Sequence, residues 1–382
     1  MNIQRLAILI RSPAADKAHW SGIPHRVHRA LESRFPEVRD FVPPPLVAEA
    51  FRWTLRRWTL KAFGKARPVG FRIGELRRRA KVVSAELNAW QPDLILAITV
   101  DDLVAFLDVD APVVLLGDAT YRLMRDYYPF FRDVPARARR RADSLCHQAV
   151  QKSRLMIYPS KWAADSAIEH YGASPEDVHR VPLGVNLEDP PSREEALREL
   201  PRDRCRLLFL GGDFERKGGP TAVRAVEVLA ERGVPAELVI VGEIEIGHPL
   251  VRCTGFLRMS EPAEVEQLRG EMQAAHMLLL PTTAEAFGIV FGEAGAWGMP
   301  SITTRTGGVP DNVIDGETGV LLPVGAGAEE YADVVERLWR DEPAYEAMRR
   351  AARDRYERVL NWEAWGDRVA EIFAALLSGG AR

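Results

Sequence analysis

Two glutamates, Glu285 and Glu293, lie in the apolar, glycine-rich stretch AEAFGIVFGEAGAWGMP, which runs from Ala284 to Pro300. If this stretch were one continuous helix, the rise between them would be about 12 Å. Carboxylate pairs that act together on one glycosidic bond lie only about 5–9.5 Å apart. Because carboxylates accept hydrogen bonds from vicinal hydroxyls, we expect each acid to bind a separate part of one elongated ligand. The alternative is that Glu293 is an exposed helix acid and Glu285 a charge at a helix start.

A second candidate is the turn in GGDFERKGGPTAVRAVEVL, from Gly211, which follows the apolar run RLLFLG. Arg216 and Lys217 are adjacent cations that could neutralise a diphosphate. Four glycines would let the backbone approach phosphates: Gly211, Gly212, Gly218 and Gly219. The spacing fits neither a P-loop nor a dinucleotide-binding fingerprint. The alternative is a charged surface turn.

Two more glycine-bearing stretches follow apolar runs. HWSGIP, from His19, places Gly22 just ahead of an amphipathic helix, where N–H groups favour an anion. An ordinary helix cap with proline in the first turn would give the same pattern. RTGGVPDN, from Arg305, would let backbone N–H groups face a ligand, or it is a plain turn.

Continuous apolar runs alternate with amphipathic stretches along the whole chain, which predicts parallel sheets covered on both faces. The predicted strands are 6–10, 94–99, 112–116, 154–159, 206–211, 237–242, 277–281, 301–304 and 319–323. Strand–helix alternation in both halves predicts an α/β fold of two Rossmann-like, doubly wound domains. Ligands bind beyond the carboxyl ends of strands in such sheets, so two domains facing each other would enclose a cleft.

The domain boundary is predicted in a polar segment that carries Pro190, Pro191 and Pro201. We therefore expect a first domain over 1–187, a linker over 188–204 and a second domain over 205–360. A final amphipathic helix is expected over 361–382.

Composition restricts the class of protein. The chain has 382 residues, a hydrophobic fraction of 47% and a net charge of −3, so it is globular and has no overall attraction to nucleic acid. Its three cysteines form neither a metal-binding spacing nor a disulfide framework, which favours the cytoplasm. No apolar run reaches the roughly 20 residues of a spanning helix.

The charge is unevenly distributed. From Arg52 to Lys81, eleven Lys or Arg residues accompany a single acid, Glu75, and Trp and Phe residues lie among them. Basic and aromatic residues together suit a lipid headgroup region, so this stretch could contact an anionic membrane or an anionic acceptor. The alternative is a solvated helix face and a loop.

Taken together, these motifs resemble the retaining glycosyltransferases of the GT-B fold, specifically the family 4 (group 1) type. The resemblance covers nearly the whole chain and is strongest over 277–323, with its paired glutamates and following glycine turn. FLGGDFERKGG resembles the family's phosphate-binding turn, and HWSGIP its N-terminal glycine loop.

The resemblance implies a nucleotide-diphosphate-sugar donor held mainly by the C-terminal domain, with Glu285 on sugar hydroxyls and Glu293 on the ribose. The implied catalytic residues are Glu285, Lys217, Arg216 and Asp118, of which Asp118 follows an N-terminal-domain strand where the family commonly has a histidine. The implied donor-binding residues are Gly22, Gly212, Phe256, Ala286, Phe287, Gly288, Ile289 and Glu293. In the family an arginine usually precedes the phosphate-binding lysine by five residues; here that position is Gly212, and Arg216 is adjacent to Lys217 instead.

The implied reaction is sugar transfer with retention to an unidentified acceptor, such as an envelope glycan, a lipid-linked molecule or an anionic small molecule. No metal and no cofactor other than the nucleotide-sugar is expected. Two alternatives stay open: a non-catalytic nucleotide-sugar-binding partner or sensor, and a nucleotide-sugar epimerase. A phosphorylase would need a pyridoxal-phosphate lysine, which we could not identify. The expected location is the cytoplasm, with peripheral contact to the inner face of the membrane through 52–81.

Overall fold

The computed structural model describes the chain except for residues 1–2, 16–18, 46–72, 129–130, 132–133 and 379–382. The chain divides into two compact units, Met1–Val181 with Gly366–Arg382, and Pro182–Trp365. The segment 188–204, predicted as a linker, lies within the second unit and contains the short helix α9 (Arg193–Ala196). Most of the basic stretch 52–81 lies outside the described residues.

The first unit is built on six parallel strands in the order β2-β1-β3-β4-β5-β6. The strands are β1 (Arg5–Leu9), β2 (Glu37–Phe41), β3 (Leu94–Ile98), β4 (Val113–Leu116), β5 (Leu155–Tyr158) and β6 (Val178–Arg180). The inner strands β3, β4 and β5 are buried along their whole length, which explains their continuous apolar sequences.

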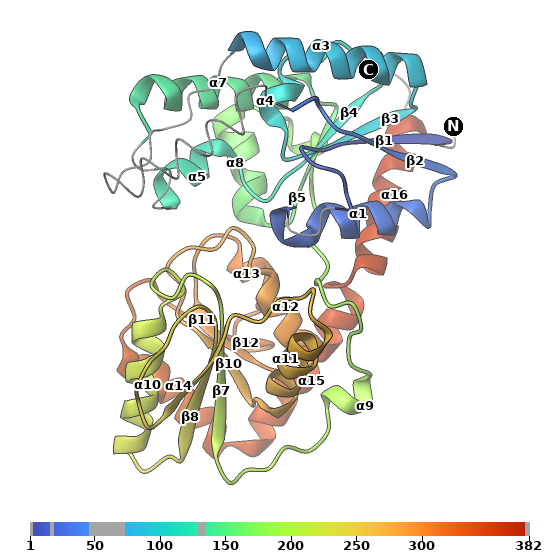
Figure 1. The fold of residues 1–382 in the computed structure, drawn as a ribbon. Helices are drawn as coiled ribbons and strands as arrows, with labels where there is room; N and C mark the ends of the chain where they lie inside the picture. The colour runs from blue at the N-terminus through green and yellow to red at the C-terminus, as the bar shows by residue number, and fades with distance from the viewer. Residues whose placement is uncertain (1–2, 16–18, 46–72, 129–130, 132–133, 379–382) are drawn as a thin grey trace. The chain divides into compact units, whose positions relative to one another are not determined.

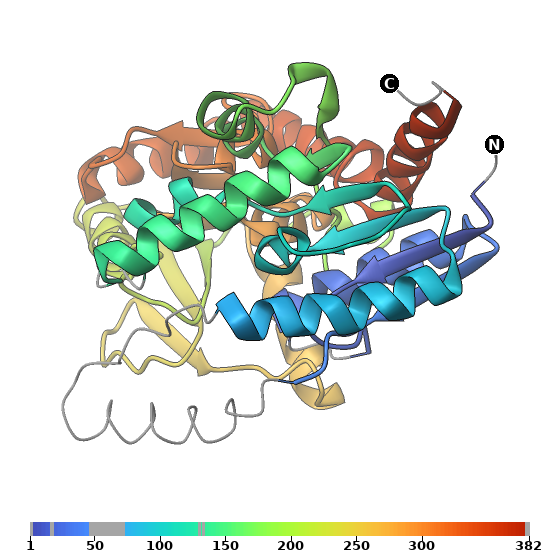
Figure 2. The ribbon, with the colours of Figure 1, turned by 90° about the horizontal axis from the view of Figure 1, so that it is seen from above.

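Helices cover both faces of this first sheet. One face packs against α3 (Ile73–Trp90), α4 (Asp101–Val104) and α7 (Ala136–Lys152). Figure 2 shows α3 and α7 running in the same direction, with α4 between them. The other helices are α1 (Ile23–Glu32), α5 (Tyr121–Tyr127) and α8 (Lys161–Tyr171), with the 3-10 turns His19–Gly22 and Pro175–Asp177.

The second unit has a sheet of six parallel strands in the order β12-β11-β10-β7-β8-β9. These are β7 (Cys205–Leu210), β8 (Ala236–Val241), β9 (Val251–Gly255), β10 (Met277–Leu280), β11 (Ser301–Thr304) and β12 (Gly319–Leu322). On one side pack α10 (Gly219–Glu231) and α14 (Ala328–Arg340). On the other lie α11 (Pro262–Ala274), α12 (Ile289–Ala296) and α15 (Glu342–Arg358) (Figure 1). The short helix α13 (Val309–Asn312) follows β11, and α16 (Trp362–Ser378) ends the described chain.

Two doubly wound parallel sheets with flanking helices confirm the predicted α/β class, and all nine predicted strands are present. In the part of the chain that the structure describes, no helix combines the length and the apolar character needed to cross a bilayer.

Candidate functional site

The predicted phosphate turn joins the carboxyl end of β7 to helix α10. Gly218 caps the helix in the left-handed conformation, with φ of 78°. A Cβ on Gly218 would lie 2.1 Å from the carbonyl oxygen of Pro281, at the end of the neighbouring strand β10. A Cβ on Gly219 would lie 2.0 Å from the ring of Phe214. Gly218 is therefore required by packing against the neighbouring loop and Gly219 by packing within its own turn, whereas Gly212 has nothing within 4 Å of its Cβ position.

Glu285 lies in the loop after β10 and is the centre of the site. Its side chain is 10% exposed, and its Oε1 lies 3.2 Å from Nη1 of Arg216. The ammonium of Lys217 contacts the same oxygen. Because β7 and β10 are adjacent, the loops that follow them meet, and the structure brings all three predicted residues together. Two cations on one buried carboxylate satisfy the requirement that a buried charge be paired.

The loop that carries Glu285 is not helical. Gly288 has φ of 78° and forms the N-cap of α12, which begins only at Ile289. The continuous helix assumed for the 12 Å estimate is therefore wrong. The side chain of Asn312 donates to the carbonyl of Gly288 at 2.8 Å, and the backbone N–H of Gly308 donates to the carbonyl of Glu285 at 3.1 Å. The glycine turn after β11 thus helps to fix the Glu285 loop.

The other predicted donor residues surround this loop or lie further along the sheet. Ala286 and Phe287 are buried, so they contribute backbone rather than exposed side chains. Glu293 is half-buried on α12. Phe256 is 57% exposed and follows Gly255, whose φ of 79° ends β9. An exposed aromatic ring at the carboxyl end of a strand can stack on a planar ligand.

The first unit holds the remaining candidates, Gly22 and Asp118. Gly22 caps α1 with φ of 78°, and the two preceding residues, Trp20 and Ser21, also have positive φ of 44° and 53°. The indole N–H of Trp20 donates to Oδ2 of Asp118 at 3.2 Å, so the glycine loop and the loop after β4 are joined. Trp20 was not among the residues predicted for the site, although an aromatic residue two positions before the predicted glycine cap could have indicated it. A non-glycine residue in the left-handed conformation carries a conformational strain of about 1–2 kcal/mol, and such residues cluster at functional sites.

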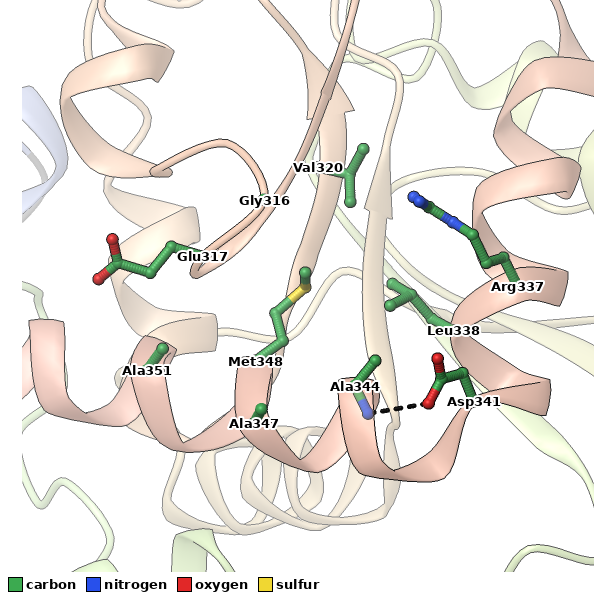
Figure 3. Close-up of a pocket in the computed structure, with 10 residues that line it drawn as sticks. All are labelled: Gly316, Glu317, Val320, Arg337, Leu338, Asp341, Ala344, Ala347, Met348 and Ala351. Carbon is green, nitrogen blue, oxygen red and sulfur yellow. Dashed lines mark hydrogen bonds between the residues drawn. The ribbon is translucent and has the colours of Figure 1, made fainter.

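A pocket of about 470 Å³ lies elsewhere in the second unit, near the amino end of β12, between α14 and α15. Figure 3 shows Met348 of α15 pointing toward Val320 of β12, with Arg337 and Glu317 at the rim. None of the predicted site residues lines it. Among the described residues, no three or more His, Cys, Asp and Glu side chains are grouped to hold a metal ion.

The chain is similar to known proteins in sequence and in fold. Residues 204–341, which hold the loops after β7, β10 and β11, match the family model Glycosyl transferases group 1. A D-inositol 3-phosphate glycosyltransferase from Nocardiopsis dassonvillei is 31% identical over 247 residues, which are 60% of this chain and 57% of that protein. The chain matches about three fifths of the length of such curated relatives.

Solved structures show the same fold. Sucrose-phosphate synthase from Thermosynechococcus elongatus superposes with a TM-score of 0.72 at 18% identity, covering 99% of this chain and all (100%) of that one. HepE from Anabaena, solved in complex with UDP-glucose, superposes with a TM-score of 0.62 at 18% identity, covering 97% of this chain and 99% of that one. The predicted fold is therefore confirmed, and the predicted resemblance to the group 1 glycosyltransferases is confirmed over residues 204–341.

Proposed function

We propose that this chain, whose residues 204–341 match the group 1 glycosyltransferases, transfers a sugar from a nucleotide-diphosphate sugar to an acceptor hydroxyl. The observation that carries the proposal is the placement of Glu285 against Lys217 and Arg216 at the carboxyl ends of two adjacent strands. A buried carboxylate beside cations can hold sugar hydroxyls and a diphosphate side by side.

In the proposed reaction the bond between the anomeric carbon and the diphosphate oxygen breaks, and a bond to the acceptor oxygen forms. The acceptor's proton passes to the leaving diphosphate on the same face, which gives retention without a side-chain nucleophile. Lys217 and the N-terminus of α12 would stabilise the charge on the leaving group, so we propose that no metal is needed. Two measurements test these points: NMR of the product's anomeric configuration, and activity after treatment with EDTA.

The acceptor that we propose is anionic, and its binding would involve the first unit. Relatives are named for D-inositol 3-phosphate, an anionic acceptor. The described part of the basic stretch forms the first half of α3, where Arg77, Arg78 and Lys81 are exposed and Val82 is 40% exposed. Cations beside an apolar side chain also suit peripheral contact with an anionic membrane surface. Sedimentation with vesicles with and without anionic lipid tests membrane contact, and equal partitioning would contradict it.

The experiment that tests the function is release of free nucleotide from a panel of UDP-, GDP-, ADP- and dTDP-sugars, with water in place of the acceptor. The wild type is compared with Glu285→Ala and Lys217→Ala. Glu317→Ala, which removes an exposed glutamate at the pocket near β12, is the matched control. We expect release from one nucleotide class by the wild type and the control, and its loss in the two site variants. Absence of release and of thermal stabilisation by any donor would contradict the proposal.

A further inference from the structure

Arg216 and Lys217 are adjacent in sequence, yet the structure uses them differently. Arg216 joins two loops. Its Nη1 donates to the carbonyl of Ala284 at 2.5 Å and lies 3.2 Å from Oε1 of Glu285. Its own carbonyl accepts from the backbone N–H and the hydroxyl of Thr283, at 2.8 and 3.0 Å. The residue is thus bonded through side chain and main chain to three consecutive residues of the Glu285 loop.

A further contact anchors Arg216 in its own turn. Its Nε donates to Oδ2 of Asp213 at 3.2 Å, and its backbone N–H donates to Oδ1 of the same residue at 3.2 Å. A guanidinium offers five donors in a fixed plane, and here two different nitrogens already point to protein acceptors. The side chain is 18% exposed. Arg216 would have to give up several bonds before it could turn toward a ligand.

The side chain of Lys217 makes fewer bonds than that of Arg216, although it is the more buried of the two, at 12% exposed. Among the described residues, its ammonium pairs with one carboxylate, that of Glu285. Its alkyl chain packs directly against the backbone of Gly211. If residue 211 had a side chain, its Cβ would lie 3.0 Å from Cγ of Lys217. A lysine is a point charge on a flexible stem, so its ammonium can change partner by rotation about its side-chain bonds. The absence of a side chain at Gly211 leaves the space that the alkyl chain of Lys217 occupies.

Two cations and two carboxylates make up this ion-pair cluster, and their charges balance without a ligand. Arg216 and Lys217 together offset Glu285 and Asp213. A diphosphate that enters beside Glu285 would meet a like charge unless one cation turns toward it. When Lys217 turns, Glu285 remains paired with Arg216, and the acceptor position that the ammonium leaves becomes available to a sugar hydroxyl.

We propose that Arg216 is a positioning residue that holds the Glu285 loop in place and does not bind the donor, so that of these two cations only Lys217, to which the proposed function already gives the diphosphate, exchanges Glu285 for it. This inference rests on the proposed function. It assigns the two cations of the turn to different tasks: Arg216 sets the position of the carboxylate, and Lys217 binds the phosphate.

The test compares affinity for free nucleoside diphosphate with turnover of the corresponding nucleotide-sugar. The nucleotide is the one released in the donor panel, and its Kd is measured by calorimetry. For Arg216→Gln we expect a Kd within about 3-fold of wild type and a kcat lowered by about 10- to 100-fold, because only the sugar-binding carboxylate is displaced. For Lys217→Gln we expect the Kd to rise by about 10-fold or more, because a charge-assisted phosphate contact is lost.

A second variant separates positioning from charge. Gly212→Arg places a cation at an open position, where no heavy atom lies within 4 Å of the new Cβ. Combined with Arg216→Gln, it restores the number of cations but not the side-chain bonds to Ala284 and Glu285, so kcat should stay low. Recovery of kcat in this double variant, or a loss of nucleotide affinity in Arg216→Gln equal to that in Lys217→Gln, would overturn the inference.

The result also separates the two proposals. A wild type that neither binds nor releases any nucleotide contradicts the function itself. A wild type that does both, with the two single variants indistinguishable in Kd and kcat, contradicts only the division of tasks. Thr283→Val removes one hydroxyl bond to the Arg216 carbonyl and should lower kcat by about 2- to 5-fold with Kd unchanged, which provides a milder variant if Arg216→Gln does not fold.

Discussion

The sharpest test of the second unit's architecture is its response to acid through His276. The ring is completely buried, with 0% exposure, at the start of β10. Its Nδ1 accepts from the backbone N–H of Arg206 at 3.0 Å, and its Nε2 donates to the carbonyl of Pro201 at 3.1 Å. The edge of Trp339 packs against it at 5.0 Å between ring centroids. A proton on Nδ1 would face the Arg206 N–H, so the site accommodates only the neutral ring.

Burial accordingly lowers the pKa of His276 from 6.5 to about 4. The folded state therefore binds fewer protons than the unfolded state between these values, and stability present above pH 6.5 is lost as the pH falls. The difference of about 2.5 between the two pKa values, at 1.36 kcal/mol each, costs the folded state about 3 kcal/mol below pH 4. The same relation gives losses of about 1 kcal/mol near pH 5.5 and about 2–3 kcal/mol near pH 4.5.

The assay is urea unfolding at about pH 7.5, 5.5 and 4.5, for the wild type and His276→Asn. Asparagine keeps an acceptor near Arg206 but does not titrate, so the variant should be less stable at neutral pH and should lose less stability on acidification. His248→Asn, which replaces a partly exposed histidine of the same unit, should follow the wild type. An equal acid-induced loss in the wild type and His276→Asn would refute the reasoning.

The remaining predictions concern a turn, a buried arginine and a partly buried acid. Gly218→Ala forces an L-residue to φ of 78° and places its Cβ 2.1 Å from the Pro281 oxygen. We therefore expect the free energy of unfolding in urea to fall by at least about 1–2 kcal/mol and nucleotide release to be reduced. Unchanged values would contradict this turn geometry. Arg353→Met fills the same space but leaves two buried carbonyls without their donor, so unfolding should require about 2–4 kcal/mol less, and an unaltered urea midpoint would argue against these bonds. Burial raises the pKa of Asp101 from 3.8 to about 6, so the folded state loses stability as the pH rises above 3.8. Asp101→Asn should therefore raise the free energy of unfolding by up to about 3 kcal/mol near pH 7.5 and by less near pH 4.5. A gain in urea unfolding that is independent of pH would disprove this.

The inner strands were predictable because their signal is local. Runs such as LILAI in β3 and MLLL in β10 are buried on both faces, and no polar residue interrupts them. The three strands that the sequence did not predict are β2, β6 and β9, and each lies at the edge of its sheet. These three strands carry polar residues, as in EVRDF of β2, so they have no continuous apolar run. The fourth edge strand, β12, has the apolar sequence GVLL and was predicted.

The candidate site was predictable as a set of residues but not as an arrangement. Glu285, Lys217 and Arg216 could be identified because each follows an apolar strand, where ligands of parallel sheets bind. The break between Glu285 and α12 depends on the left-handed conformation of Gly288, which the sequence permits but does not require. The bond between Trp20 and Asp118 joins residues 98 positions apart, and no pattern along the chain indicates it.

By itself, then, the sequence determined where strands end and which polar residues follow them, because hydrophobic periodicity and glycine placement act over a few neighbouring residues. Only the tertiary structure decided that β10 lies beside β7, and hence that the Glu285 loop reaches the Lys217 turn. Strand order is set by the packing of helices against both faces of the sheet, a long-range property of the whole unit. That packing fixes Arg216 to the loop of Glu285 and leaves Lys217 with a single ionic partner among the described residues.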